Sequence, residues 1–177
     1  LRDQGEDARA EAMHTLMTTP NLLLSLAFEP AGCRVVQTAL VTSDRQTVKR
    51  IAAIMHGHAC RGTLHPDCNF VIQKIAAYAS EDAAFVAHEL LGTGALVARN
   101  VFGCRVLCRL LEYLPSTTIR ELIEEIMEWN LRKLCRHFYG HHVIESILEH
   151  GTTEQRKRIA SVLFHDLLQK AKSKNAS

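Results

Sequence analysis

Short apolar stripes with helical spacing recur along the whole chain, separated by turn residues. Val48, Ile51, Ala52 and Met55 fall at intervals of three, one and three residues, which places them on one face of a helix. Similar stripes follow at residues 85–91 and 119–126, and the leucines at 22, 23, 24 and 26 make another segment strongly apolar. The pattern therefore predicts an all-α chain.

Turn and capping residues divide this pattern into elements. Pro20 fits the first turn of a helix, and Pro30 ends that helix. Ser43 with Gln46, and Thr152 with Gln155, have the spacing of a capping box. We expect helices at residues 6–16, 20–29, 31–40, 43–56, 58–64, 67–78, 80–91, 95–98, 102–113, 116–128, 129–135, 139–149, 152–163 and 164–174.

One six-residue pattern occurs four times. The copies are GCRVVQ at 32–37, CNFVIQ at 68–73, GCRVLC at 103–108 and GHHVIE at 140–145. Counted from Cys33 to Asn69, Cys104 and His141, the steps are 36, 35 and 37 residues. A period in this range is typical of a stacked repeat array. The aliphatic pair keeps its character while other positions vary, as a modular polymer-binding protein requires.

The period predicts the domain organisation. We expect four repeats at about residues 20–56, 57–92, 93–128 and 129–164, with residues 1–16 as the last helix of a preceding repeat and 165–177 as the start of a truncated fifth. The first residue is not Met, and residues 1–7 are charged and polar rather than a signal peptide. We therefore expect both ends to be cut from a longer array.

The variable positions of each copy lie on one side of a helix. Cys33, Arg34 and Gln37 span about 100° of arc, while Val35 and Ala39 are expected to point toward neighbouring helices. Helices stacked about 8–10 Å apart would repeat this strip along a concave face. Such a face can present one unpaired base to each repeat.

Two kinds of candidate contact residue follow. The second position of the trio is always planar and is expected to stack on bases: Arg34, Phe70, Arg105 and His142. For Phe70 alone, packing in the core is the alternative. The flanking positions are expected to contact base edges: Cys33 with Gln37, Asn69 with Gln73, Cys104 with Cys108, and His141 with Glu145.

Composition limits the partners. The net charge is only +2, which argues against a protein that holds phosphates by bulk attraction, although base stacking needs no high charge. No apolar run approaches the roughly 18 residues of a membrane span, so no membrane association is expected. Six cysteines without a CxxC pair are interpreted as reduced thiols of an intracellular protein.

Catalytic and metal-binding hypotheses have weaker support in the sequence. Cys104 and Cys108 have helical spacing that could share a metal, but no matching pair is nearby. His141 and His142 are adjacent, so their side chains should point about 100° apart and not chelate one ion; Glu145 is within reach of His141. No phosphate loop, nucleophile elbow or HExxH motif occurs. We expect no enzyme, no metal and no cofactor. The glutamates at 121, 124, 125 and 128 are interpreted as a solvated face.

These residues carry a family resemblance. Residues 28–37 and 65–74 closely resemble the motif of Pumilio-type (PUF family) RNA-binding repeats, and residues 138–151 are similar in frame. The resemblance implies a right-handed, armadillo-like superhelical solenoid of three-helix repeats, with the motif on the second helix. It also implies a cytoplasmic monomer that binds messenger RNA 3′ untranslated regions and regulates them post-transcriptionally, with protein partners on its convex face.

The resemblance further implies which bases are bound. Cys33 with Gln37 implies adenine, Asn69 with Gln73 implies uracil, and Glu145 implies guanine. The resemblance also implies that RNA runs antiparallel to the repeats, so the expected core is 5′-G-N-U-A-3′. Cys108 departs from the family pattern, and the third repeat is expected to discriminate poorly. Two alternatives stay open: a protein-interaction scaffold resembling armadillo or HEAT arrays, and a divergent family member acting on ribosomal RNA precursors in the nucleolus. The planar series favours RNA.

Overall fold

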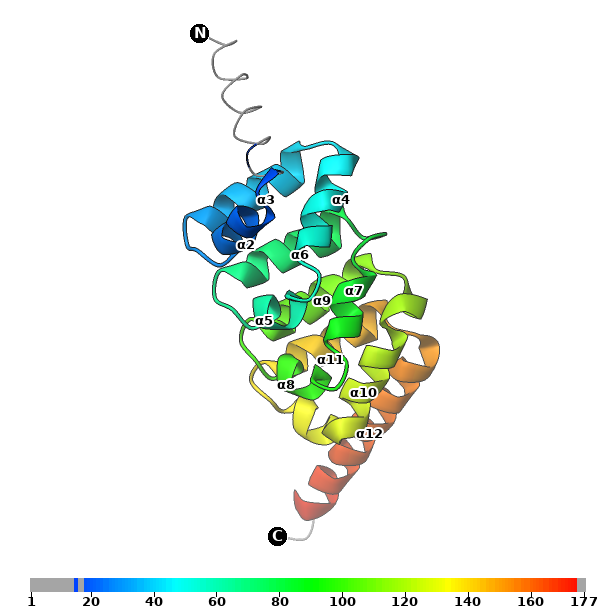
Figure 1. The fold of residues 1–177 in the computed structure, drawn as a ribbon. Helices are drawn as coiled ribbons and strands as arrows, with labels where there is room; N and C mark the ends of the chain where they lie inside the picture. The colour runs from blue at the N-terminus through cyan, green and yellow to red at the C-terminus, as the bar shows by residue number, and fades with distance from the viewer. Residues whose placement is uncertain (1–14, 16–17, 175–177) are drawn as a thin grey trace.

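The fold is a row of helices in a computed structural model that describes Thr15 and residues 18–174 (Figure 1). In that part of the chain there is no strand, as expected. The helix predicted at residues 6–16 lies outside it except for Thr15. The helices are α2 (Pro20–Ala27), α3 (Gly32–Thr42), α4 (Arg45–Ile54), α5 (Ala59–Thr63), α6 (Cys68–Tyr78), α7 (Ala84–Glu89), α8 (Gly94–Ala98), α9 (Gly103–Tyr113), α10 (Ser116–Cys135), α11 (Gly140–His150) and α12 (Thr153–Lys174).

The helices form repeats of three, as the sequence predicts. The second helix of each period carries the repeated motif, and we call α3, α6, α9 and α11 the recognition helices. Each packs against the next along the row, and each also packs against the short first helix that precedes it. The third helices α4, α7, α10 and α12 follow them. Equivalent residues of successive repeats are thereby placed on successive neighbouring helices.

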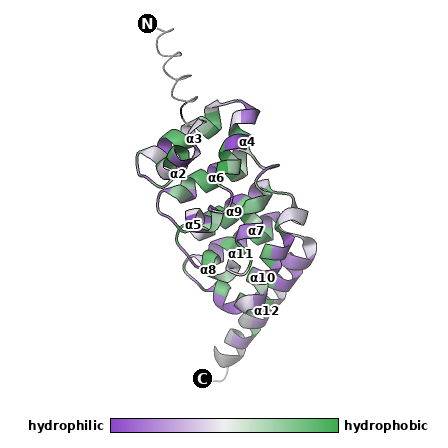
Figure 2. Cartoon of the chain, in the orientation of Figure 1, coloured by the Kyte–Doolittle hydropathy of each residue, from purple (hydrophilic) through white to green (hydrophobic). Residues whose placement is uncertain are grey.

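The aliphatic pair of the motif forms the contact between recognition helices. Val71, Val106 and Val143 are all completely buried. Their counterpart Val35 is 51% exposed, which corrects the expectation that it packs on a neighbouring helix. The reason is its place in the row: α3 packs on α6 on one side, and no recognition helix of the described residues lies on the other. In Figure 2 the central helices α6 and α9 carry much of the hydrophobic colour, whereas α10 and α12 are more hydrophilic.

Two predicted helix starts, at residues 43 and 80, lie two and four residues before the observed ones. The cap of α4 is Asp44 rather than Ser43: its carboxylate accepts a hydrogen bond from Thr47 N at 2.8 Å. The helix predicted from residue 80 begins only at Ala84. The acidic residues before it pair with the preceding repeat instead, Glu81 with Arg45 and Asp82 with Lys49. Inter-repeat ion pairs thus occupy side chains that the sequence suggested as helix-starting residues.

The last two third helices differ at their ends: α10 has a kink close to the predicted boundary, and α12 continues through it. α10 contains the predicted segments 116–128 and 129–135, joined at Asn130, whose backbone is non-helical (φ −171°, ψ 85°) and whose side chain accepts from Lys133 N at 2.9 Å. α12 runs through the expected boundary at residue 164, although its capping box between Thr152 and Gln155 is confirmed. The boundaries before the second and third repeats instead carry glycines with positive φ, Gly57 and Gly92. A left-handed glycine stops a helix at these two places, whereas α10 is interrupted by the extended backbone of Asn130.

A first helix and its recognition helix approach closely at two facing positions, and in each repeat one of the two residues is glycine. A Cβ at Gly32 would lie 2.6 Å from the carbonyl oxygen of Leu26, and one at Gly103 would lie 2.4 Å from that of Val97. A Cβ at Gly140 would lie 2.5 Å from Cδ1 of Leu134 and 3.1 Å from its carbonyl oxygen. In the second repeat the glycine and the larger residue exchange positions. Cys68 stands at the glycine position, and a Cβ on Gly62 would lie 2.9 Å from its sulfur.

The acidic residues of α10 are not simply a solvated face. Glu125 accepts hydrogen bonds from Gly92 N at 2.7 Å and Gly94 N at 2.8 Å, at the start of α8. Glu124 pairs with Arg158 and accepts from Gln155 Nε2 at 2.8 Å. Glu89 repeats the first arrangement one period earlier, at the start of α5. A carboxylate on the third helix therefore caps the first helix of its own repeat, where backbone N–H groups lack partners.

Replacing Glu125 by alanine is expected to lower the free energy of unfolding by about 1–2 kcal/mol, the usual cost of losing a helix N-cap. The matched control is Glu121→Ala, because Glu121 is exposed on the same helix. Chemical denaturation of both variants, with circular dichroism as the signal, compares the two. Equal unfolding midpoints would contradict the capping role.

Candidate nucleic-acid interface

A polar side chain in each loop fixes the start of three recognition helices. His65 Nδ1 accepts from the backbone N–H groups of Asp67 and Cys68, at 3.2 and 3.3 Å. Asn100 Oδ1 and His137 Nδ1 do the same at the starts of α9 and α11. These residues were not among the predicted functional positions. Their recurrence three residues before each helix, at steps of 35 and 37, is the signal in the sequence that could have identified them.

The four predicted stacking residues share one exposed row. Arg34, Phe70, Arg105 and His142 all point away from the core, each from the first turn of its recognition helix. Phe70 is 42% exposed, whereas the next two residues, Val71 and Ile72, are completely buried. The alternative that Phe70 is a core residue is therefore wrong. Every one of the four repeats therefore exposes a planar side chain at this position.

Motif positions are counted here from Cys33 as the first, so that Gln37 is the fifth. The prediction that the first position belongs to the exposed strip is wrong. Cys33 and Cys104 are 3% exposed, Asn69 is completely buried, and only His141 in the fourth repeat is partly exposed. The fifth positions, Gln37, Gln73, Cys108 and Glu145, are partly or fully exposed. The reason is that the first position faces the loop before its own helix, so the surface row consists of the second and fifth positions.

The buried first position orients the fifth. Asn69 donates to the carbonyl oxygens of His65 and Pro66, both at 2.7 Å, and its Oδ1 accepts from Gln73 Nε2 at 2.9 Å. In the first repeat Gln37 Nε2 donates to the sulfur of Cys33 at 3.6 Å. In these two repeats the predicted edge pair is thus in contact, and the buried member holds the amide of its partner in place. The carbonyl oxygens of Gln37 and Gln73 keep an unused acceptor for a ligand.

The third repeat replaces this amide with the thiol of Cys108. The thiol donates to the carbonyl oxygen of His142 at 3.6 Å. Burial, followed by the nearby Cys104, raises the pKa of Cys108 to about 11, so the group is a neutral thiol at physiological pH. Its one proton is directed at the next repeat. Cys108 therefore offers a base edge little beyond a weak sulfur acceptor.

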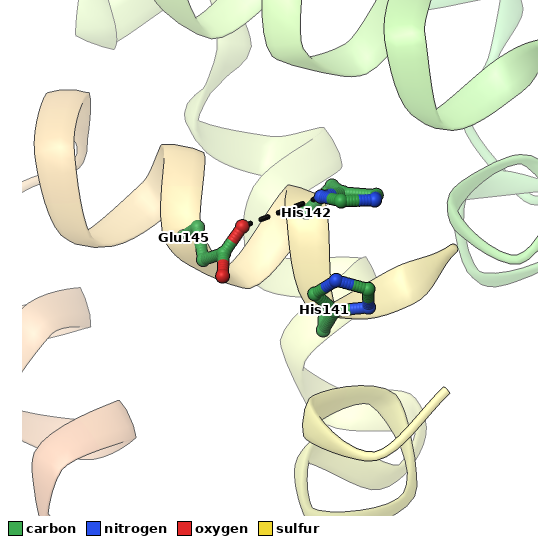
Figure 3. Close-up of side chains that lie close together, drawn as sticks. All are labelled: His141, His142 and Glu145. Atoms are coloured by element: carbon green, nitrogen blue, oxygen red, sulfur yellow. Dashed lines mark hydrogen bonds and ion pairs between the residues drawn. The ribbon is translucent and has the colours of Figure 1, made fainter. Parts of the chain in front are cut away.

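The fourth repeat differs from expectation in its pairing (Figure 3). Glu145 Oε2 lies 3.3 Å from Nδ1 of His142, not in a hydrogen bond with His141. His141 Nδ1 instead lies 2.9 Å from the carbonyl oxygen of His137. The centroids of the two imidazole rings are only 3.9 Å apart, which corrects the expectation that adjacent side chains point well apart. The turn of the helix separates their Cα–Cβ bonds, but the rotamers bring the rings together.

A hollow of about 600 Å³ lies at the junction of the third and fourth repeats. Arg105 and Cys108 line it from α9, and His142 and Glu145 line it from α11. Gln73 and Tyr139 contribute from α6 and the loop before α11. Predicted stacking and edge residues of successive repeats therefore surround one space.

Comparison with known proteins places these features in context. A family model described as the Pumilio-family RNA binding repeat matches residues 23–56, 95–127 and 130–164, more than half of the chain. Residues 57–94, which hold the exchanged pair Gly62 and Cys68, lie between the matched ranges. Pumilio homolog 12 of Arabidopsis thaliana is 26% identical over 149 residues, which cover 81% of this chain and 24% of that relative. The chain thus spans about a quarter of this curated relative.

Solved structures show the same fold. PUF-8 in complex with PBE-RNA superposes with a TM-score of 0.80 at 23% identity, over 87% of this chain and 46% of PUF-8. The Puf4 RNA binding domain, bound to an HO endonuclease RNA 3′ UTR recognition sequence, gives 0.76 at 20% identity, over 86% and 48%. The predicted α-solenoid of Pumilio-type repeats is confirmed. None of the helices in the described part of the chain is both long and apolar enough to cross a bilayer.

Proposed function

Because the chain belongs to the Pumilio family of RNA-binding repeat proteins, we propose that it binds single-stranded RNA sequence-selectively, with one base at each repeat. The observation that supports this most directly is the row of exposed planar side chains, Arg34, Phe70, Arg105 and His142, on four neighbouring recognition helices. Unpaired bases stack on such groups, and the fifth motif position lies one turn away to contact the base edge.

The repeats, at about residues 20–56, 57–92, 93–128 and 129–164, each contact one base in this proposal. Gln37 and Gln73, held by Cys33 and Asn69, contact adenine and uracil. Cys104 and Cys108 discriminate weakly. Glu145 retains a carboxylate oxygen, Oε1, beyond the one near His142, and a carboxylate matches the two adjacent donors of guanine. The preferred core is 5′-G-N-U-A-3′.

The wider role follows from the relatives. The structures of Puf4 and Puf3 are described as bound to 3′ UTR recognition sequences. We infer that this chain likewise binds messenger RNA 3′ untranslated regions in the cytoplasm and acts without catalysis or a cofactor. A protein-interaction scaffold is disfavoured, because contact with a folded partner gives no reason for a planar side chain at every repeat. Selection of bound sequences from nuclear and cytoplasmic RNA separates messenger from pre-ribosomal targets.

Binding to an unpaired 5′-GNUA-3′ oligonucleotide is expected to be at least about tenfold tighter than binding to the same sequence within a duplex, because stacking requires exposed base faces. Fluorescence anisotropy with both RNAs at one salt concentration measures the ratio.

Oligonucleotides with single base replacements provide the control for specificity. Replacement at the adenine or uracil position should weaken binding more than replacement at the N position, where Cys108 is the edge residue. Equal affinity for the duplex, or equal tolerance at all positions, would contradict the proposed function.

A further inference from the structure

The fourth recognition helix carries a cluster of three potential metal ligands. One ligand atom from each of His141, His142 and Glu145 lies within 4.8 Å of the other two (Figure 3). The equivalent positions in the other repeats are Cys33, Arg34 and Gln37, then Asn69, Phe70 and Gln73, then Cys104, Arg105 and Cys108. None of those sets combines two imidazoles with a carboxylate, so the cluster is specific to the fourth repeat.

The structure already orients one of these ligands. His141 Nδ1 lies 2.9 Å from the carbonyl oxygen of His137, so this nitrogen carries the proton and Nε2 keeps its lone pair. An imidazole that donates its second N–H to a carbonyl is the usual arrangement of a metal-bound histidine. His137 is itself fixed by hydrogen bonds from Tyr139 N and Gly140 N. This chain of contacts holds the His141 ring at the start of α11.

The other two ligands are free to adjust. The side chains of His142 and Glu145 are 52% and 67% exposed, and their mutual contact of 3.3 Å ties them only to each other. Ligand atoms around a tetrahedral Zn²⁺ lie roughly 3.4 Å apart, given metal–ligand bonds of about 2.0–2.1 Å. Closing from 4.8 Å therefore shortens the separation by about 1.4 Å, which rotation of two exposed side chains supplies.

We propose that His141, His142 and Glu145 form a binding site for a divalent transition metal of the Zn²⁺ class. Two imidazole nitrogens and one carboxylate oxygen suit such ions, whereas Mg²⁺ and Ca²⁺ prefer oxygen ligands alone. Three protein ligands leave one coordination position of a tetrahedral ion to solvent. Arg105 lines the hollow beside His142 and Glu145 and opposes a cation there, while Glu149 on the same hollow favours one.

The site overlaps the surface proposed to bind RNA. A bound ion would coordinate the carboxylate of Glu145 and the ring of His142. In the proposed function the fourth repeat uses both groups to contact its base. Metal binding should therefore weaken recognition at the 5′ base and leave the adenine and uracil positions unchanged. This second step rests on the proposed function, whereas metal binding itself does not.

Isothermal titration of the tag-free chain with ZnCl₂ tests the site, because an oligohistidine tag would bind the same ion. We expect His141→Ala, His142→Ala and Glu145→Gln each to reduce the affinity of one Zn²⁺ site by about tenfold or more, as loss of even a supporting residue does. His165→Ala is the matched control, since His165 is an exposed histidine on α12. MgCl₂ should give no such site.

Circular dichroism of each variant separates loss of ligand from loss of fold, and Glu145→Gln keeps the size and polarity of the side chain. Affinities within twofold of the unaltered chain in all three variants, or the same loss in His165→Ala, would overturn the proposal. Anisotropy with RNA, with and without Zn²⁺, then tests the coupling. If Zn²⁺ binds but RNA does not, the metal site stands and the proposed function fails. If both bind independently, the site stands without the coupling.

Discussion

Replacing Phe70 by alanine is expected to weaken binding of single-stranded RNA by about 1–3 kcal/mol, which is roughly 5- to 150-fold in affinity. The ring is 42% exposed in the second repeat, between the planar groups of Arg34 and Arg105 on the neighbouring recognition helices. A base loses one complete stacking face when the ring is removed. Fluorescence anisotropy with an oligonucleotide that contains the expected core measures the change.

The thermal midpoint of the same variant should change little, because the neighbours that form the helix contact are Val71 and Ile72, both completely buried. Phe164→Ala is the matched control: Phe164 is 64% exposed on α12, outside the recognition helices. Loss of RNA affinity in both variants would point to a nonspecific effect of removing surface rings. A collapse of the thermal midpoint with Phe70→Ala would show that the ring supports the fold.

Gly103→Cys is expected to destabilise the fold by about 3 kcal/mol. A Cβ at this position would lie 2.4 Å from the carbonyl oxygen of Val97, so the clash is with backbone and not with a side chain that can rotate away. The helices α8 and α9 would have to separate, and overpacking of this kind typically costs 1–3 kcal/mol or more. Denaturant unfolding monitored by circular dichroism measures the loss.

The second repeat suggests how part of the lost folding stability can be recovered. It has Cys68 in place of the glycine and Gly62 in place of the residue equivalent to Val97. Adding Val97→Gly to Gly103→Cys removes the contact of the new Cβ with Val97 Cγ1 at 2.8 Å but leaves the contact with the carbonyl oxygen, so the pair should be less destabilising than the sum of the two single changes by only about 0.5–1 kcal/mol. Additive effects would mean that the two positions do not share one space, and that the exchange in the second repeat has another cause.

The sequence alone determined the architecture, because the information for it is local and repeated. Apolar positions at helical spacing define individual helices, and four copies of one motif at nearly constant steps define the array. The same periodicity identified the four planar residues, since the equivalent position of each copy must face the same way once the copies stack. Helix ends were less well determined, because an acidic residue before a helix can cap it, as Asp44 does, or form an inter-repeat ion pair, as Glu81 and Asp82 do before Ala84.

Only the tertiary structure decided how deep each contact residue lies and which group it touches. Asn69 and Gln73 have similar amides and lie four residues apart, yet one is completely buried and supports the other. Glu125 is indistinguishable in sequence from Glu121, but the start of α8 lies against only one of them. Likewise, helical geometry separates His141 from His142, and only the rotamers fixed by the His137 carbonyl and by Glu145 bring their rings together. Burial and hydrogen bonding depend on residues distant in sequence, so a local pattern cannot contain them.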